Sequence, residues 1–286
     1  MKLSITGCGG RMTGMLGMVR DVATDLGHEV DELSIFDVDR ESVVTRLAGL
    51  GIGEEAIRFY DDPDTMLDSE NPDGVMIGTR CSLHATMAAK VLERNLPLFL
   101  EKPVATTKPD LIGLKTAYEA SSSNVVVSFP LRLTPLVALA KEIVDSGKIG
   151  TIEHLQAVNN VPYGGVYFHN WYRDEIETQG LFLQKATHDF DYINYLLGIE
   201  PVSICAVTSK RIFTGDKPPG LYCRDCDERT SCPEGPFHMK HRVYEGATGD
   251  QCSFAVDTGN EDSGSALITY ESGMHVSYSQ NFFARA

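Results

Sequence analysis

Two scarcities in this 286-residue sequence exclude several classes of protein. No stretch approaches the roughly 20 apolar residues that a membrane-spanning helix needs. Basic residues are also scarce, because 25 lysines and arginines stand against 40 acidic residues, a formal net charge of −15. A surface of that sign repels phosphate backbones and anionic lipids. We therefore expect neither nucleic acid nor a membrane as a partner.

The cysteines lack the spacing of a disulfide framework. There are seven, an odd number, and Cys8, Cys81, Cys205 and Cys252 are scattered along the chain. The opening residues, MKLSITGCGG, contain an apolar run too short for a signal peptide. Reduced thiols without a leader predict a cytoplasmic protein.

What the first part of the chain does contain is the alternation of an α/β fold. We expect strands at 2–6, 33–36, 74–77, 98–100 and 125–129, and helices at 12–26, 40–50, 82–94 and 110–120. The expected strands are apolar throughout, which is typical of a parallel sheet covered by helices on both faces. Residues 1–128 are therefore predicted to form one domain.

Longer and more alternating strands characterise residues 129–286. They are expected at 152–159, 202–211, 253–257, 265–270 and 274–281, with helices at 135–146 and 184–197. This pattern predicts an α+β domain with a largely antiparallel sheet. Residues 214–249 lack periodicity and are rich in Gly, Pro and charge, so they are expected to form a long loop or insertion.

A glycine-rich turn, GCGGRM, follows the first expected strand and precedes a helix. Gly7 permits the tight turn, and Gly9 lets the backbone approach a pyrophosphate. The amides of Gly10, Arg11 and the rest of the first helical turn would then face the anion. The third glycine of the usual G-x-G-x-x-G is Met12 here, which places close helix–strand packing in question more than phosphate binding. A glycine turn without a ligand is the alternative interpretation.

Asp37 ends the second expected strand, where an acidic side chain can accept hydrogen bonds from the ribose hydroxyls of a dinucleotide. This position favours NAD over NADP. Arg40 keeps NADP open, and Asp37 also fits a helix-capping role.

Two further groups of residues suggest chemistry. Lys102, in Glu101-Lys102-Pro103, follows an apolar strand and should face the crevice at the carboxyl edge of the sheet, although a solvated lysine is the simpler interpretation. Lys185, His188 and Asp191 are spaced three residues apart on an expected helix and so share one face. A histidine between a lysine and an aspartate can take and return a proton near neutral pH.

The chain resembles the Gfo/Idh/MocA oxidoreductases over essentially its whole length. Three motifs carry the resemblance: the glycine turn, the Glu-Lys-Pro at 101–103 and the Lys-x-x-His-Asp-x-Asp at 185–191. The segments GTRCSLHATMAAKVLERNLPLFLEKPVA and SGKIGTIEHLQ also resemble that family, with Arg80 where proline is usual. The resemblance implies an N-terminal Rossmann fold, followed by a domain with a large open sheet that often makes dimer or tetramer contacts.

Carried over by position, Lys102 matches the family's active-site lysine and His188 its catalytic histidine. Thr79 and His84 fall in the family's block before Glu101, so the cofactor is expected to lie against them; His84 also fits a simple place in a first helical turn. Gln184 stands where many members have an aspartate, which leaves the proton relay open.

The implied reaction transfers hydride between NAD(P) and a sugar, polyol or related hydroxyl compound. His188 would remove the hydroxyl proton, Lys102 would orient the hydroxyl, and Lys185 or Asp191 would tune His188. An aromatic loop before the catalytic helix offers substrate contacts, equally suited to packing: Tyr163, Tyr167, His169, Trp171 and Arg173. An NAD-using glycosidase and a non-catalytic cofactor-sensing regulator are the alternative functions.

Cys223-x-x-Cys226-x5-Cys232 lies in the expected insertion, with His238 and His241 just after it. Three thiolates and an imidazole would complete a tetrahedral structural zinc site, and a loop of reduced cysteines is the alternative. The sequence stops in or just after a strand, and an open sheet edge favours pairing with another chain. We therefore expect a homo-oligomer.

Overall fold

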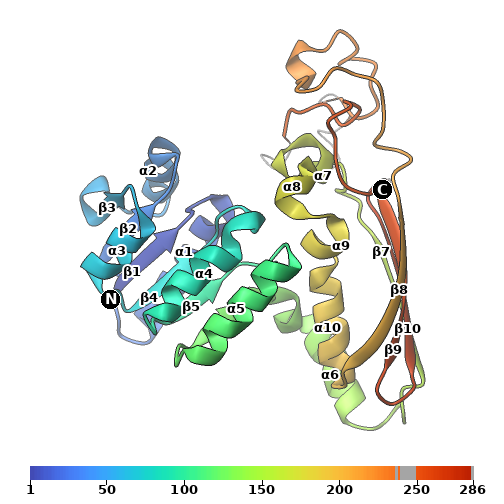
Figure 1. Cartoon of the computed structure of the whole chain (residues 1–286), viewed down its shortest axis with the longest axis horizontal. Coiled ribbons are helices and arrows are strands. Elements are labelled where there is room, and N and C mark those ends of the chain that lie inside the picture. The colour runs from blue at the N-terminus through green and yellow to red at the C-terminus, as the bar shows by residue number, and fades with distance from the viewer. Residues whose placement is uncertain (236–237, 239–248, 285–286) are drawn as a thin grey trace. The chain divides into compact units, whose positions relative to one another are not determined.

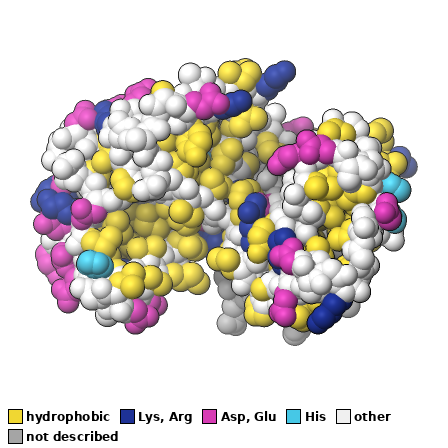
Figure 2. All heavy atoms as spheres, turned by 90° about the horizontal axis from the view of Figure 1, so that it is seen from below, with side chains coloured by type: hydrophobic (Ala, Val, Ile, Leu, Met, Phe, Trp, Pro, Cys, Tyr) yellow, Lys and Arg dark blue, Asp and Glu magenta, His cyan; other side chains and the backbone are white. Residues whose placement is uncertain are grey.

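The computed structural model describes residues 1–235, 238 and 249–284, which divide into two compact units, Met1–Ser128 and Phe129–Ala286 (Figure 1). Each unit has its own sheet and hydrophobic core. Over the described ranges, no helix combines the length and apolarity needed to cross a bilayer. Figure 2 shows acidic side chains dispersed over the visible face rather than gathered in one patch.

The N-terminal unit is built on a six-stranded parallel sheet with the order β3-β2-β1-β4-β5-β6, the order typical of dinucleotide-binding folds. Its strands are β1 (Lys2–Thr6), β2 (Glu32–Phe36), β3 (Ile57–Tyr60), β4 (Gly74–Ile77), β5 (Leu98–Leu100) and β6 (Val125–Val127). Its α-helices are α1 (Gly10–Asp25), α2 (Arg40–Ala48), α3 (Pro63–Glu70), α4 (His84–Glu93) and α5 (Lys108–Ala120). The predicted parallel α/β fold is confirmed.

Helices on both faces of this sheet explain its apolar strands. Leu16 of α1 packs in one core cluster with Ile5 and Ile35. Val91 of α4 packs in a second cluster with Ile77. Side chains on both faces of the sheet are therefore shielded from water.

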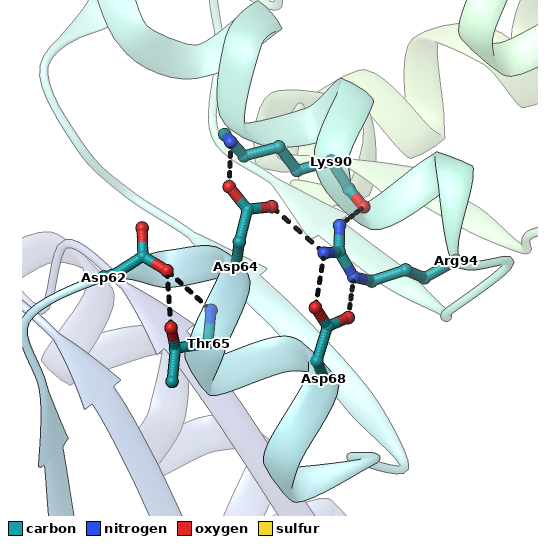
Figure 3. Close-up of polar contacts among 6 residues, drawn as sticks. All are labelled: Asp62, Asp64, Thr65, Asp68, Lys90 and Arg94. Carbon is teal, nitrogen blue, oxygen red and sulfur yellow. Dashed lines mark hydrogen bonds and ion pairs between the residues drawn. The ribbon is translucent and has the colours of Figure 1, made fainter.

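Strand β3 and helix α3 do not emerge from the sequence patterns, because their apolar runs are short and interrupted by charge. Capping and ion pairs define α3 instead (Figure 3). Asp62 accepts the amide of Thr65 at 2.7 Å and caps the helix. Arg94 of α4 forms a bidentate pair with Asp68 of α3 at 2.6 and 3.1 Å, and its guanidinium also donates to the carbonyl of Lys90. Polar contacts thus join two neighbouring helices.

The C-terminal unit contains a four-stranded mixed sheet in the order β7-β10-β9-β8. Strands β10 and β7 are parallel, whereas β10–β9 and β9–β8 are antiparallel, so the mostly antiparallel prediction is confirmed. The strands are β7 (His154–Asn160), β8 (Pro201–Ser209), β9 (Ser263–Tyr270) and β10 (His275–Asn281). The α-helices are α6 (Pro135–Asp145), α7 (Val166–His169), α8 (Glu175–Thr178), α9 (Leu181–Gln184) and α10 (Thr187–Leu197).

Helices cover one face of this sheet and leave the other open (Figure 1). Ile193 of α10 packs with Ile268 and Val276, and alternate residues of β9 are buried and exposed. Strand β8 is exposed along its whole length. On the open face Val207 and Leu267 are both exposed, at 67% and 60%.

One expected element of this unit is wrong, and another is shorter than expected. Residues 253–257 form turns with a single bridge, Lys217↔Ala255. The amide of Ala255 donates to the carbonyl of Cys252, three residues back, and the amide of Val256 donates to the carbonyl of Lys217. The helix expected over 184–197 is interrupted at Lys185 and Ala186, so α9 and α10 are separate.

Candidate functional site

The glycine turn after β1 has the geometry of an anion site. Gly7 adopts φ +79°, and a Cβ there would lie 2.6 Å from the backbone nitrogen of Thr79, so only glycine fits. A Cβ on Gly9 or Gly10 would meet nothing within 4 Å, which means that the backbone faces open space. Gly9 is the N-cap of α1 and has no side chain to cap it. The first-turn amides can therefore serve a bound pyrophosphate.

Met12 occupies the place of the third glycine, and the structure compensates on the facing strand. Met12 is 1% exposed. A Cβ on Gly78, just after β4, would lie 2.7 Å from its Cε and 3.1 Å from its Cβ. Gly78 thus allows α1 and the end of β4 to pack closely, a role that the third glycine of the fingerprint, on the helix, usually has. The sequence signal for this was the glycine that directly follows the GVMI strand.

Asp37 connects the end of β2 to the glycine turn. Its carboxylate accepts the amide of Cys8 at 2.7 Å and that of Asp39 at 2.8 Å. Helix α2 is capped by Asp39 rather than by Asp37. Arg40 forms an ion pair with Asp61, and its guanidinium lies 5.4 Å from the ring centre of Phe59. A guanidinium held in this way is less available to a 2′-phosphate.

His84 ties together the ends of β4 and β5. Its Nδ1 donates to the carbonyl of Pro103 at 2.7 Å, and its Nε2 lies 3.2 Å from the carbonyl of Thr79. Burial lowers the pKa of His84, against the opposing effect of these carbonyls, so the ring favours its neutral form. Half-buried Lys102 directly precedes Pro103 and is thereby positioned by this bridge.

Glu101 is buried and receives the side chain of Arg11. The Arg11 Nε donates to Glu101 at 3.1 Å, and the same guanidinium donates to the hydroxyl of Ser128 at 3.3 Å. The first turn of α1 is therefore held to the ends of β5 and β6. The N-terminal unit thus brings together the glycine turn, Asp37 and the segment from Glu101 to Pro103 at the carboxyl edge of its sheet.

In the C-terminal unit, Lys185 pairs with a residue that sequence reasoning missed. The Lys185 Nζ lies 3.9 Å from Asp189, and both side chains are less than 10% exposed. Asp189 also accepts the amide of Asn159 at 2.6 Å and the hydroxyl of Tyr278 at 2.7 Å. The sequence signal for this pair is the four-residue spacing from Lys185 to Asp189.

Asp191, expected beside His188, is engaged elsewhere. Its carboxylate forms a bidentate pair with Arg132 of the 3₁₀ helix η3 (Pro130–Leu133). His188 is half-buried, and the ring of Phe129 meets it edge-on with the centroids 6.0 Å apart. The structure therefore brings Lys185 to Asp189 and gives Asp191 a separate partner.

The candidates of the aromatic loop are two buried side chains fixed by hydrogen bonds and three half-buried rings. Arg173 is buried, donates to the carbonyl of Cys252 at 2.8 Å and pairs with Asp257. His169 is buried and donates to the carbonyl of Gln251 at 2.8 Å. These two side chains hold the loop against residues 251–257.

The remaining candidates of that loop cluster as rings. Tyr167 lies 6.4 Å from Tyr163 and 5.4 Å from Tyr172 between ring centroids, and Trp171 lies 4.0 Å from Tyr172. Burial raises the pKa of Tyr167 well above its usual value, so its hydroxyl stays protonated.

The cysteine cluster is described only in part. Cys223 is buried, Cys226 and Cys232 are half-buried, and all three are free thiols. His238 is exposed, and His241 lies outside the described residues. Among the residues that the structure places, no three His, Cys, Asp or Glu side chains are spaced to hold a metal ion.

Comparisons with known proteins agree with this architecture. Residues 40–129 match the model of the oxidoreductase family with an NAD-binding Rossmann fold, and residues 137–286 match the GFO/IDH/MocA C-terminal domain. YteT of Bacillus subtilis (strain 168), an oxidoreductase by name, is 27% identical over 253 residues, and the match covers 79% of this chain and 59% of YteT. Inositol 2-dehydrogenase 2 of Saccharopolyspora erythraea is 28% identical over 167 residues, 58% of this chain and 47% of that protein.

The chain thus spans about half of the length of the curated relatives that it matches. Among solved structures, the WlbA dehydrogenase of Bordetella pertussis, in complex with NADH and UDP-GlcNAcA, superimposes with a TM-score of 0.71 at 19% identity. That match covers 99% of this chain and 72% of the other. At this identity the likeness shows the fold.

Proposed function

Because the chain belongs to the GFO/IDH/MocA family of NAD-binding oxidoreductases, we propose that it transfers hydride between NAD and a hydroxyl carbon of a sugar, polyol or related compound. The observation that carries this proposal is the glycine turn. Gly7 admits no Cβ, while Gly9 and Gly10 leave open space in front of uncapped helix amides. Such a turn fits the pyrophosphate of a dinucleotide.

NAD is favoured over NADP by the surroundings of β2. The carboxylate of Asp37 stands at the strand end, where a ribose diol is bound in Rossmann folds. A 2′-phosphate would bring its negative charge beside this carboxylate, and Arg40 is already paired with Asp61. Bound NAD would supply the hydride acceptor.

The chain's own residues would supply position and proton transfer. Lys102, held between buried Glu101 and Pro103, would donate a hydrogen bond to the substrate hydroxyl. His188 would accept the hydroxyl proton as general base. Lys185 would place a positive charge near that site, held by Asp189. Asp191 is less suited to the tuning role, since Arg132 engages its carboxylate.

The substrate class rests on the relatives and on the loop. One relative is named as an inositol 2-dehydrogenase, and the WlbA dehydrogenase is in complex with a nucleotide sugar. The rings of Tyr163, Tyr167 and Trp171 would suit the faces of a sugar or polyol, whereas His169 and Arg173 are committed to packing.

A homo-oligomer is also proposed. The open face of the C-terminal sheet carries exposed apolar side chains, Val158, Val207 and Leu267 among them, and β8 is an edge strand of the described sheet. A shallow depression of about 360 Å³ lies on this sheet and is lined in part by Cys205, Val207 and Leu267. A second sheet could cover that face.

Calorimetric titration with NAD and NADP tests the cofactor, and absorbance of reduced nicotinamide with a panel of inositols, sugars and nucleotide sugars tests the reaction. We expect NAD to bind more tightly and at least one panel member to produce reduced cofactor in proportion to product. Product without net reduction would favour an NAD-using glycosidase instead. Failure of both dinucleotides to bind would overturn the proposal.

A further inference from the structure

Four cysteines of the C-terminal unit have no part in the proposed hydride transfer. Cys223 and Cys252 are buried, Cys226 and Cys232 are half-buried, and all four are free thiols. The other three lie within residues 214–249 and Cys252 lies beyond them, so its sequence position alone gives no reason to group it with them. Hydrogen bonding in the fold does.

A short antiparallel pairing brings Cys223 and Cys252 together. Tyr222 and Gln251 form the bridge, and it is flanked by backbone bonds from the amides of Cys223 and Cys252, 2.6 and 2.8 Å long. Each cysteine is one residue from the bridge, so both side chains point to the face opposite that of Tyr222 and Gln251. They are diagonal neighbours, a separation that side chains of paired strands can bridge.

Turns connect Cys223 to the other two thiols along the chain. Cys223 begins the 3₁₀ helix η5 (Cys223–Asp225), and the amide of Cys226 donates to its carbonyl at 3.2 Å. With three residues per turn, these two side chains lie on one side. Cys232 follows in the next turn, where its amide donates to the carbonyl of Glu228 at 2.9 Å.

The backbone therefore brings Cys223, Cys226 and Cys252 together. The turns that lead to Cys232 begin at Cys226, whose carbonyl accepts the amide of Arg229 at 3.2 Å.

We propose that Cys223, Cys226, Cys232 and Cys252 bind one structural zinc ion as a tetrahedral four-thiolate site. A C-x2-C pair with two further thiols is a common structural zinc set. In the described part of the chain, no three of these side chains lie close enough together to hold a metal ion. They would close on it as it binds, as in small domains where metal binding and ordering are coupled. Cys252, rather than His238 or His241, is the fourth ligand.

The site lies next to the hydrogen bonds that hold the aromatic loop. The carbonyl of Cys252 accepts Arg173, and its neighbour Gln251 exchanges hydrogen bonds with His169. A zinc ion that fixes Cys252 to Cys223 would thereby hold the aromatic loop of the candidate substrate site. Loss of the metal should loosen that loop without removing any residue of the proposed reaction.

Metal content of the full chain tests the proposal. The protein is purified under reducing conditions without chelators or a metal-binding tag, incubated with zinc, desalted, and analysed by mass spectrometry of the elements. We expect one zinc per chain, lost in Cys252→Ser and kept in the matched control Cys205→Ser, whose thiol is exposed on β8. Cys252→His should retain the metal, because imidazole is also a zinc ligand.

Cobalt(II) substitution of the unaltered chain reports the ligands even if Cys252→Ser does not fold. The absorption spectrum should show intense bands of tetrahedral cobalt(II) and thiolate-to-cobalt charge transfer of an intensity expected for four sulfur ligands. In Cys252→His the charge-transfer intensity should correspond to three sulfur ligands. The proposal is overturned if the reduced wild-type chain binds no zinc, if Cys252→Ser retains it undiminished, or if iron with acid-labile sulfide is found. Failure of NAD to bind would leave these outcomes unaffected.

Discussion

The two units build their candidate sites from different materials. In the N-terminal unit the site is made of backbone: glycines that leave room, uncapped helix amides, and the carbonyls of Thr79 and Pro103 held by His84. In the C-terminal unit it is made of side chains, because Lys185 is held by Asp189, which in turn accepts Tyr278. A backbone site is sensitive to any added Cβ, whereas a side-chain site is sensitive to the loss of one charge.

The largest expected effect is on the proton transfer assigned to the side-chain site. His188→Asn should lower kcat by about 10²–10⁴-fold, because a general base is lost. NAD affinity, measured calorimetrically, should be unchanged, because the glycine turn holds the cofactor. The control is His275→Asn, a change at an exposed histidine of β10. Full activity of His188→Asn would remove this residue from the reaction.

Truncating the anchor of Lys185 should have the next largest effect. Asp189→Ala leaves a buried lysine, Asn159 and Tyr278 without their acceptor, and we expect a loss of about 3 kcal/mol in the free energy of unfolding. Asp191→Ala should cost less, because the side chain of its partner Arg132 is 43% exposed and can be hydrated. Urea unfolding measures both. Equal losses would contradict the central place given to Asp189.

Added bulk should affect the backbone site. In Gly78→Ala the new Cβ would be crowded by Met12 and by the carbonyl of Gly7, 3.1 Å away, and should cost about 1–3 kcal/mol. Gly14→Ala is the matched control, since its Cβ would meet nothing within 4 Å and alanine favours a helix.

Met12→Ala introduced together with Gly78→Ala should recover part of the loss, which a double-mutant cycle would detect. The readouts are thermal unfolding and NAD affinity. If Gly78→Ala behaves like Gly14→Ala, close packing is not the function of Gly78.

The smallest effect is a pH dependence from His84. Its folded pKa lies below the unfolded value of 6.5, so the unfolded chain binds more protons between the two values. Stability due to the neutral ring is complete above about pH 6.5 and is lost as the pH falls below it, with a slope of at most about 1.4 kcal/mol per pH unit. His84→Gln should flatten this part of the unfolding profile. An unchanged slope would show that His84 does not titrate in that range.

The contrast between the units also explains what was predictable. Five of the six strands of the Rossmann sheet, all but β3, are evident in the sequence because helices cover both faces of the sheet, and the glycine turn is a local motif. Helix α3, by contrast, depends on a cap and on ion pairs to α4, such as Arg94 with Asp68, that no apolar pattern contains. The break at Lys185 was missed because the helical spacing of apolar residues continues across it.

Local sequence patterns were sufficient to predict the parallel sheet, the mostly antiparallel second sheet and the family, since each is marked by residues close together in the chain. The partners that these elements contact are seen in the folded structure alone. Gly78 faces Met12 from the end of another strand, Asp189 meets Tyr278 from 89 residues away, and Cys252 joins Cys223 across a strand pairing. Such contacts depend on how the chain folds back on itself, and local propensity carries no record of that.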